Sequence, residues 1–415
     1  MNTRTPLQKA PAANVLSVSF NGDYSCFAVG LETGFCIFDA ETCQLRTTRD
    51  FNAGVGLAQM MGKANYVGLV GGGRRPKFAS NKLVIWDDLK SRAALEISAL
   101  TPVRGVQLSK ERIVVVLQNS VRIYKFAKNP QLISAYETAN NPWGLCCLGT
   151  TKVAFPGRSV GHVQVEELGM DNVSIIPAHA SALRAITLSR DGNLVATASE
   201  TGTLIRIFST ATCAKLVELR RGIDTATIFS LAFNPSSTML ACTSDKATLH
   251  IFDVPHTRRP AARPSQPEQD QRPGSSSGPG GQGQGHDGRS RWGILSKLPM
   301  MPRVFSDVYS SAQATFSASD DGDDELDDTG APNPLRSGNS AAAGKSLAHM
   351  ADSLATLGTA TRPIKGVLGW VDEDVLLVVG GGMDARWERF VVREAEDGSK
   401  VCRREGWRRY LATPV

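Results

Sequence analysis

Two arginines stand side by side near the middle of the chain, in the stretch KLVELRRGIDTAT that covers 215–227. The arginine guanidinium is a planar fork of N–H donors that matches the oxygens of a phosphate group in pairs. The segment before Gly222 has the residue types of a β-strand, in which successive side chains leave on opposite sides. We therefore expect Arg220 and Arg221 to point apart and to serve two sites, one on each side of the strand.

The charge balance of the chain limits the kinds of partner it suits. Its 415 residues carry 46 Lys and Arg against 40 Asp and Glu, which gives a formal net charge of +6. This mild excess suits contact with an anionic surface but is too small to indicate nucleic acid binding. Hydrophobic residues make up 41% of the chain, enough for a substantial core, and the length fits one large all-β domain or two average domains.

The eight cysteines are scattered, and none forms a C-x-x-C pair or a His/Cys cluster with the spacing of a zinc site. Most lie within apolar strand patterns, where a cysteine acts as a small buried hydrophobic residue. We therefore expect a reducing compartment and neither a metal nor a cofactor. The first 20 residues have no apolar signal core. The sequence also lacks a run of 18 apolar residues, which is about the length needed to span a bilayer. Any membrane contact is expected to be peripheral.

Three stretches of the chain share one pattern, and they cover 15–45, 183–216 and 228–254. Each has an alternating apolar strand, a turn of the N-G, D-G or N-P type, a strand of small residues, a second turn and a strand with an aromatic residue. Period-2 strands joined by such short turns are typical of β-hairpins. Weaker copies, which bring the total to seven, cover 53–98, 101–138, 140–176 and 363–411.

The spacing of these units predicts a β-propeller. Equivalent third-strand positions recur every ~40–45 residues, the length of a four-stranded propeller blade; they are Phe38, Trp86, Tyr124, Val165, Phe208 and Phe252. Blades packed in a ring bury both faces of each sheet and leave only short edges. We expect an all-β fold, a seven-bladed β-propeller of four-stranded blades with a long disordered insertion in the sixth blade.

The insertion sets the predicted division of the chain: blades one to six, or most of six, over 1–256, the insertion over 257–361, and a seventh blade that closes the ring over 362–415. Most of 257–361 is rich in Pro, Gly, Ser and Gln or carries the acidic run DDGDDELDD, compositions typical of disorder.

Residues 291–316 differ from the rest of the insertion because they are rich in apolar side chains. Two roles remain open for them. Part of the segment can complete the sixth blade as its outer strand, or its first part can dip into a membrane interface through Trp292, Ile294, Leu295 and Leu298. Pro299 and Pro302 argue against an uninterrupted interfacial helix.

Several stretches, taken in order along the chain, resemble the PROPPIN family of phosphoinositide-binding β-propellers, called WIPI proteins in animals. They are LVGGGRRPKFASNKLVIWDD (69–88), NPWGLC (141–146), AFPGRSVGHVQV (154–165), AHASALRAITLSRDGNLVATASETGTLIRIF (178–208), KLVELRRG (215–222) and SDKATLHIF (244–252). The likeness covers nearly the whole chain apart from 257–361, and the double arginine before glycine is the family's signature. The leucine ahead of the double arginine resembles the signature of one subgroup, which includes the two short WIPI proteins and their fungal relatives.

The resemblance implies two lipid-headgroup sites flanking the signature. The first, in the fifth blade, has Arg220 with His179, Ser199, Thr201, Thr203 and Arg206. The second, in the sixth blade, has Arg221 with Thr243, Ser244, Lys246, Thr248 and His250. These residue types suit an inositol phosphate, because hydroxyl groups and turn N–H groups complete a coordination that arginine begins, and histidine adds a donor.

The resemblance further implies a non-enzymatic scaffold that recognises phosphatidylinositol 3-phosphate, and also the 3,5-bisphosphate, on cytosolic membrane faces. It implies work in autophagy at phagophore (preautophagosomal), endosomal or vacuolar membranes, with an autophagy-related lipid-transfer protein as partner. We expect a chain that is monomeric in solution.

Two other interpretations stay open. A WD-repeat scaffold that binds only proteins would use both arginines structurally, since charged residues also guard exposed sheet edges. A hydrolase is suggested by GRSVG at 157–161, which fits the G-x-S-x-G pattern. That pattern requires a strand–turn–helix elbow, whereas here it follows FPG and enters a strand pattern, so a turn is the better interpretation.

Overall fold

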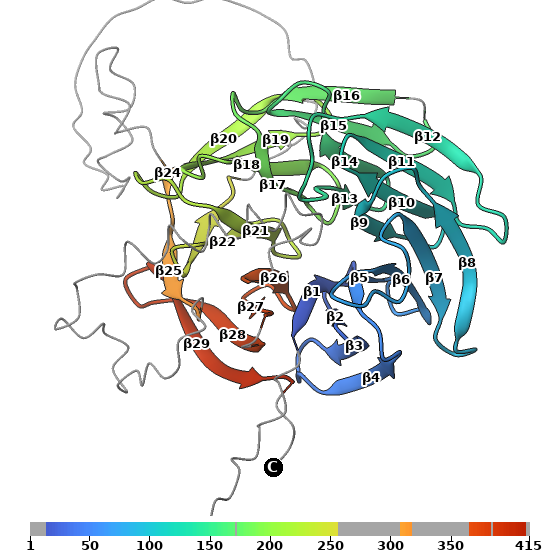
Figure 1. The fold of residues 1–415 in the computed structure, drawn as a ribbon. Coiled ribbons are helices and arrows are strands. Elements are labelled where there is room, and N and C mark those ends of the chain that lie inside the picture. Colours follow the sequence, from blue (N-terminus) through green and yellow to red (C-terminus); the bar gives the residue numbers. More distant parts are fainter. Residues whose placement is uncertain (1–13, 171, 256–307, 318–364, 383–384, 412–415) are drawn as a thin grey trace, which may run out of the picture.

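The computed structural model describes residues 14–170, 172–255, 308–317, 365–382 and 385–411. These residues form seven sheets arranged as blades of a ring, with the first strand of each sheet nearest the centre (Figure 1). The described residues contain no helix. The predicted all-β, seven-bladed propeller of four-stranded blades is therefore confirmed.

The first four blades follow the chain without interruption. Blade one has β1 (Val15–Phe20), β2 (Cys26–Leu31), β3 (Gly34–Asp39) and β4 (Leu45–Asp50). Blade two has β5 (Val55–Met60), β6 (Tyr66–Gly71), β7 (Lys82–Asp87) and β8 (Arg92–Ser98). Blade three has β9 (Val103–Leu108), β10 (Arg112–Leu117), β11 (Ser120–Lys125) and β12 (Leu132–Glu137). Blade four has β13 (Cys147–Leu148), β14 (Lys152–Pro156), β15 (His162–Glu167) and β16 (Asn172–Pro177).

The last three blades include strands from within the predicted insertion and from beyond it. Blade five has β17 (Leu183–Leu188), β18 (Leu194–Ser199), β19 (Leu204–Ser209) and β20 (Lys215–Arg220), with β24 (Val308–Tyr309) added in parallel. Blade six has β21 (Ile228–Phe233), β22 (Met239–Ser244), β23 (Thr248–Asp253) and β25 (Ala312–Thr315). Blade seven has β26 (Val367–Trp370), β27 (Val375–Val379), β28 (Arg386–Glu394) and β29 (Lys400–Arg409).

Strand β25 is the outer strand of blade six, the first of the two roles considered for residues 291–316. Strand β24 was not predicted; it pairs with β20 and joins the same segment to blade five. The four residues of the membrane-dipping role, Trp292, Ile294, Leu295 and Leu298, lie outside the described residues. Ser159 of the GRSVG motif lies in the turn between β14 and β15, with a strand and not a helix after it.

Burial explains why the inner strands have few polar residues. A sheet packed between two others buries both faces, so strands such as β2 (CFAVGL) are buried at every position. Outer strands such as β4 and β12 alternate between exposed and half-buried side chains. The core is accordingly divided into clusters, each shared by two neighbouring blades, as between blades five and six.

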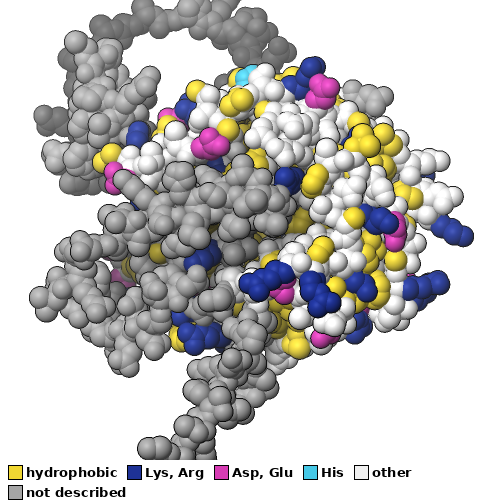
Figure 2. Space-filling model, viewed as in Figure 1, with side chains coloured by type: hydrophobic (Ala, Val, Ile, Leu, Met, Phe, Trp, Pro, Cys, Tyr) yellow, Lys and Arg dark blue, Asp and Glu magenta, His cyan; other side chains and the backbone are white. Residues whose placement is uncertain are grey.

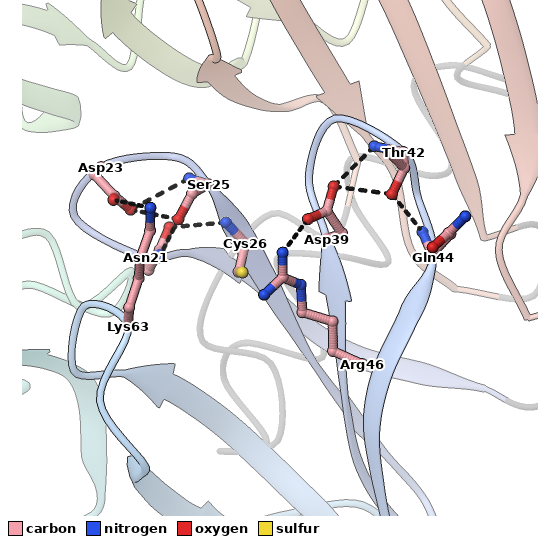
Figure 3. Close-up of polar contacts among 9 residues, drawn as sticks. All are labelled: Asn21, Asp23, Ser25, Cys26, Asp39, Thr42, Gln44, Arg46 and Lys63. Carbon is pink, nitrogen blue, oxygen red and sulfur yellow. Dashed lines mark hydrogen bonds and ion pairs between the residues drawn. The ribbon is translucent and has the colours of Figure 1, made fainter.

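Side chains of Asn, Asp, Ser and Thr hold the turns of the blades, because they hydrogen-bond the backbone locally. Figure 3 shows the β1–β2 and β3–β4 turns of blade one: Asn21 Oδ1 accepts from Cys26 N at 3.0 Å, and Asp39 Oδ1 accepts from Thr42 N at 2.9 Å. Lys63 from blade two forms an ion pair with Asp23 at 3.4 Å, which ties the two blades together at this edge.

Blade seven closes the ring against blade one. Trp387 is 5% exposed, and its Nε1 donates to Ala40 O at 2.8 Å. Val15 N donates to Gly382 O at 3.1 Å, which joins the first strand of the chain to the seventh blade. On the face shown in Figure 2, Lys and Arg side chains are more widespread than Asp and Glu, most of all over the part formed by β1 to β8.

We predict that Trp387→Ala lowers the free energy of unfolding by ~3–5 kcal/mol, because it removes a buried indole and its hydrogen bond at the closure. Trp407→Ala in the same blade is the control: its side chain is half exposed, and the expected loss is about 1 kcal/mol or less. Urea denaturation followed by circular dichroism measures both, and equal losses would contradict the closure role.

Candidate headgroup-binding grooves

The strand register places the two arginines of the signature on opposite faces of blade five. Arg220 is the last residue of β20 and pairs with Leu204 of β19. Arg221 follows in the same extended run, and its backbone N donates to Thr203 O at 3.0 Å. Leu219, one residue before Arg220, packs in the core between blades five and six. Since side chains alternate, Arg220 leaves toward blade four and Arg221 toward blade six.

The groove between blades four and five, here called the first groove, holds most residues predicted for the first site. His179 Nε2 lies 3.0 Å from Thr197 Oγ1, and Ser199 Oγ lies 2.9 Å from Thr201 Oγ1. Arg206 points to blade four, where it donates from Nη1 to Ala178 O at 2.6 Å. The side chain of Thr203 is half-buried at the mouth of the β18–β19 turn. Hydroxyl, imidazole and guanidinium groups thus share one groove.

An acidic residue also lies in the first groove. Glu218 accepts from Arg206 Nε at 2.8 Å and pairs with Lys215 Nζ at 3.2 Å. Burial alone would raise the pKa of Glu218, but the hydrogen bonds from Arg206 and Lys215 outweigh it and leave that pKa lowered. The charge of Arg206 is therefore partly neutralised by Glu218. Arg220 is a second cation on the same face of the blade, at the end of β20.

The groove between blades five and six, the second groove, is built around Arg221. Its side chain is 8% exposed; Nε donates to Gly202 O at 2.7 Å and Nη2 to Asp224 O at 2.5 Å. Among the described residues no carboxylate forms an ion pair with this guanidinium, so backbone carbonyls position it without cancelling its charge. Gly202 has a φ of +62° and approaches Ala226 O so closely that a Cβ would lie 1.7 Å from it, so glycine is required there.

Blade six supplies the other side of the second groove. His250 Nε2 lies 3.1 Å from Thr248 Oγ1, and its Nδ1 lies 3.3 Å from Ser310 Oγ. Ser244 is fully buried, with Oγ 3.5 Å from Thr248 Oγ1, and Lys246 is exposed at the β22–β23 turn. Ser244, Thr248 and His250 share the face that looks toward blade five, and Lys246 lies at the turn next to them.

Thr243 alone of the predicted residues of the second site lies elsewhere. Its Oγ1 donates to Gly366 O at 2.5 Å, so its side chain faces blade seven. Three residues that the sequence analysis did not name stand in the grooves: Thr197, Glu218 and Ser310. Glu218 could have been found, because it lies two residues before Arg220 on the same face of a strand. Ser310 comes from the middle of the predicted insertion 257–361, where no pattern marked it.

Both groove histidines are neutral near pH 7. Burial, followed by the charge of Arg206, lowers the pKa of His179 to about 4. Burial, followed by the charge of Arg221, lowers the pKa of His250 to about 4. In the free protein each ring is therefore a neutral hydrogen-bonding group, and a bound anion would favour its protonation.

Among the described residues, no cluster of three or more His, Cys, Asp or Glu could hold a metal ion. The same residues include no helix with the length and apolar composition to cross a membrane.

Fold and grooves together define a propeller that presents polar, arginine-containing grooves on both faces of one blade. Comparison with known proteins is consistent with this class. The PROPPIN family model matches residues 14–271. The SVP1-like protein 2 of Neurospora crassa is 47% identical over 445 residues, which cover 99% of each chain.

Two solved structures have the same fold. Hsv2 of Kluyveromyces lactis gives a TM-score of 0.68 at 19% identity and covers 96% of this chain and all of its own. A complex of KlAtg21 with the coiled-coil of AgAtg16 gives a TM-score of 0.59 at 17% identity over 95% of this chain and 99% of the other. The chain belongs to the PROPPIN family.

The neutral histidines predict a pH dependence of stability. Between pH 6.5 and about 4, the unfolded chain protonates both histidines while the folded chain does not. Their contribution to stability is therefore complete above pH 6.5 and is lost as the pH falls toward 4. We expect the double variant His179→Gln, His250→Gln to show a shallower fall of the thermal midpoint between pH 7 and pH 5. An unchanged slope would show that other groups control this window.

Proposed function

We propose that this chain is a non-enzymatic peripheral membrane scaffold that recognises phosphatidylinositol 3-phosphate, and also the 3,5-bisphosphate, through its first and second grooves. One observation carries the proposal. Arg221 is a buried guanidinium that carbonyl groups position but no described carboxylate neutralises, and it stands beside His250, Thr248 and Ser244. A buried cation in that state favours an anion as its partner.

The groups in the grooves fit a phosphorylated inositol ring. Arginine contributes paired donors to phosphate oxygens, and the hydroxyls of Ser and Thr donate to the remaining oxygens or to ring hydroxyls. A charge-assisted hydrogen bond contributes roughly 1.5–3 kcal/mol, so loss of the central arginine should weaken a groove by about 10- to 100-fold.

Two grooves on one blade also give avidity. Arg220 and Arg221 are neighbours in sequence, so the two grooves lie close together. When one lipid headgroup is bound in the first groove, the second groove is held close to other headgroups of the same membrane. Effective concentrations in such tethered arrangements reach the mM range. Two individually weak grooves can therefore produce firm yet reversible attachment, and the apolar residues Trp292, Ile294, Leu295 and Leu298 would add buried area at the bilayer surface.

Membership of the PROPPIN family suggests work in autophagy at phagophore, endosomal or vacuolar membranes. We infer that protein partners dock on other blades, away from the lipid grooves, with an autophagy-related lipid-transfer protein as one of them. The solved complex of KlAtg21 with the coiled-coil of AgAtg16 supports the general idea that a propeller of this shape can hold a protein partner.

The alternative is a protein scaffold without lipid binding. The bonds of Arg221 to Gly202 O in the β18–β19 turn and to Asp224 O in the link between β20 and β21 favour it, because they give the arginine a structural role. The two functions differ in what the double variant Arg220→Thr, Arg221→Thr does. Headgroup binding predicts that flotation with vesicles containing phosphatidylinositol 3-phosphate is abolished while the folded ring persists.

The control is Lys110→Thr, Arg190→Thr, which removes the same charge from two exposed residues on turns at the opposite end of the strands. It should float like the wild type. Thermal unfolding of all three proteins separates lost binding from lost folding. Flotation of a folded Arg220→Thr, Arg221→Thr variant at the wild-type level would favour the protein scaffold.

A further inference from the structure

Blade seven repeats part of the geometry of blade five. Arg409 is paired with Arg386 at the start of β28, as Arg220 is paired with Leu204 at the start of β19. Tyr410 N then donates to Ala385 O at 3.1 Å, as Arg221 N donates to Thr203 O at 3.0 Å. Arg409 therefore occupies in blade seven the position that Arg220 occupies in blade five.

The face that bears Arg409 looks toward blade six. Phe390 and Val392 on this face of β28 belong to the core shared with blade six. Arg386 Nη1 donates to Ser317 Oγ at 2.7 Å, and Ser317 N donates to Glu388 Oε1 at 2.8 Å, so the end of blade six is bonded to the same face. We call this the third groove; its residues are Ser317, Arg386, Glu388, Arg404, Trp407 and Arg409.

The described side chains of the third groove carry a net positive charge. Among them Glu388 is the one carboxylate, against the guanidinium groups of Arg386, Arg404 and Arg409. The side chain of Glu388 is 2% exposed and is paired with Arg404 at 2.9 Å. Glu388 stands where Arg206 and His250 stand in the other two grooves, since all three are third in their strands. A carboxylate there opposes a phosphate deep in the groove but leaves the rim basic.

The rim also carries an exposed aromatic residue. Trp407 lies across from Glu388 and is 49% exposed, and the guanidinium of Arg386 lies 5.0 Å from its ring centroid. Arg409 is exposed beside it. An arginine next to a half-exposed tryptophan suits a bilayer interface, where the ring lies at the headgroup level and the cation meets lipid phosphates.

We propose that the rim of the third groove, chiefly Arg409 and Trp407, contacts the anionic bilayer surface beside the lipids held in the other two grooves. The inference rests on the proposed function, because it places this rim at the membrane that the other two grooves bind. Among the described strands, β25 lies between the second groove and β29 at this edge of the ring. The ligand is the charged surface of the membrane, such as one containing phosphatidylserine, and not a selected headgroup. One arginine near such a surface changes the affinity by about five-fold.

The test uses Arg409→Gln in the full chain and vesicles of constant phosphatidylinositol 3-phosphate content, with or without phosphatidylserine. We expect the variant to bind about five-fold more weakly when phosphatidylserine is present and to match the wild type when it is absent. The control is Arg403→Gln, an exposed arginine of β29 that pairs with Val391 on the opposite face. It should behave like the wild type on both vesicles.

Three outcomes would overturn the inference: no effect of Arg409→Gln, an equal effect of Arg403→Gln, or weaker binding of soluble inositol 1,3-bisphosphate by Arg409→Gln. The last would make the third groove a headgroup pocket. A failure here leaves the recognition of the 3-phosphate intact. Failure of the proposed function appears instead as undiminished flotation of Arg220→Thr, Arg221→Thr, so the two are distinguishable.

Discussion

Both grooves depend on one constraint of extended backbone: adjacent side chains leave a strand on opposite sides. In blade five that constraint persists one residue past the end of β20, because Arg221 N still donates to Thr203 O. Blades stand on both sides of this strand end, so each arginine meets a different neighbour. A single dipeptide thereby supplies the central cation of two grooves, and Gly222 ends the run immediately afterwards.

The propeller turns this local alternation into sites by bringing distant segments to the same edge. His250 contacts Ser310, which lies 60 residues later, within the segment 257–361 that was predicted as an insertion. His179 lies in the link between β16 and β17, and its side chain is hydrogen-bonded to Thr197 of β18. The two residues meet because this link passes over the face of blade five that carries the side chain of Thr197. The rigidity of the grooves comes from the apolar clusters beneath them, which each pair of blades shares.

The sequence predicted the ring well, because repetition is visible without any contact information. Phe38, Trp86, Tyr124, Val165, Phe208 and Phe252 all lie in third strands, as their spacing indicated. Local alternation also predicted that Arg220 and Arg221 diverge. Thr243 was placed in the second site by the family resemblance, whereas alternation excludes it: it adjoins Ser244 in sequence, so its hydroxyl turns away toward Gly366. Ser310 depends on which strands become neighbours, which no local pattern specifies.

The most direct measurement counts headgroups. Isothermal titration of the protein with soluble inositol 1,3-bisphosphate should give two sites per chain, and Arg220→Thr or Arg221→Thr alone should each leave one. A stoichiometry of one in the wild type, or loss of all binding in either single variant, would show that the two arginines converge on one site and would contradict the account.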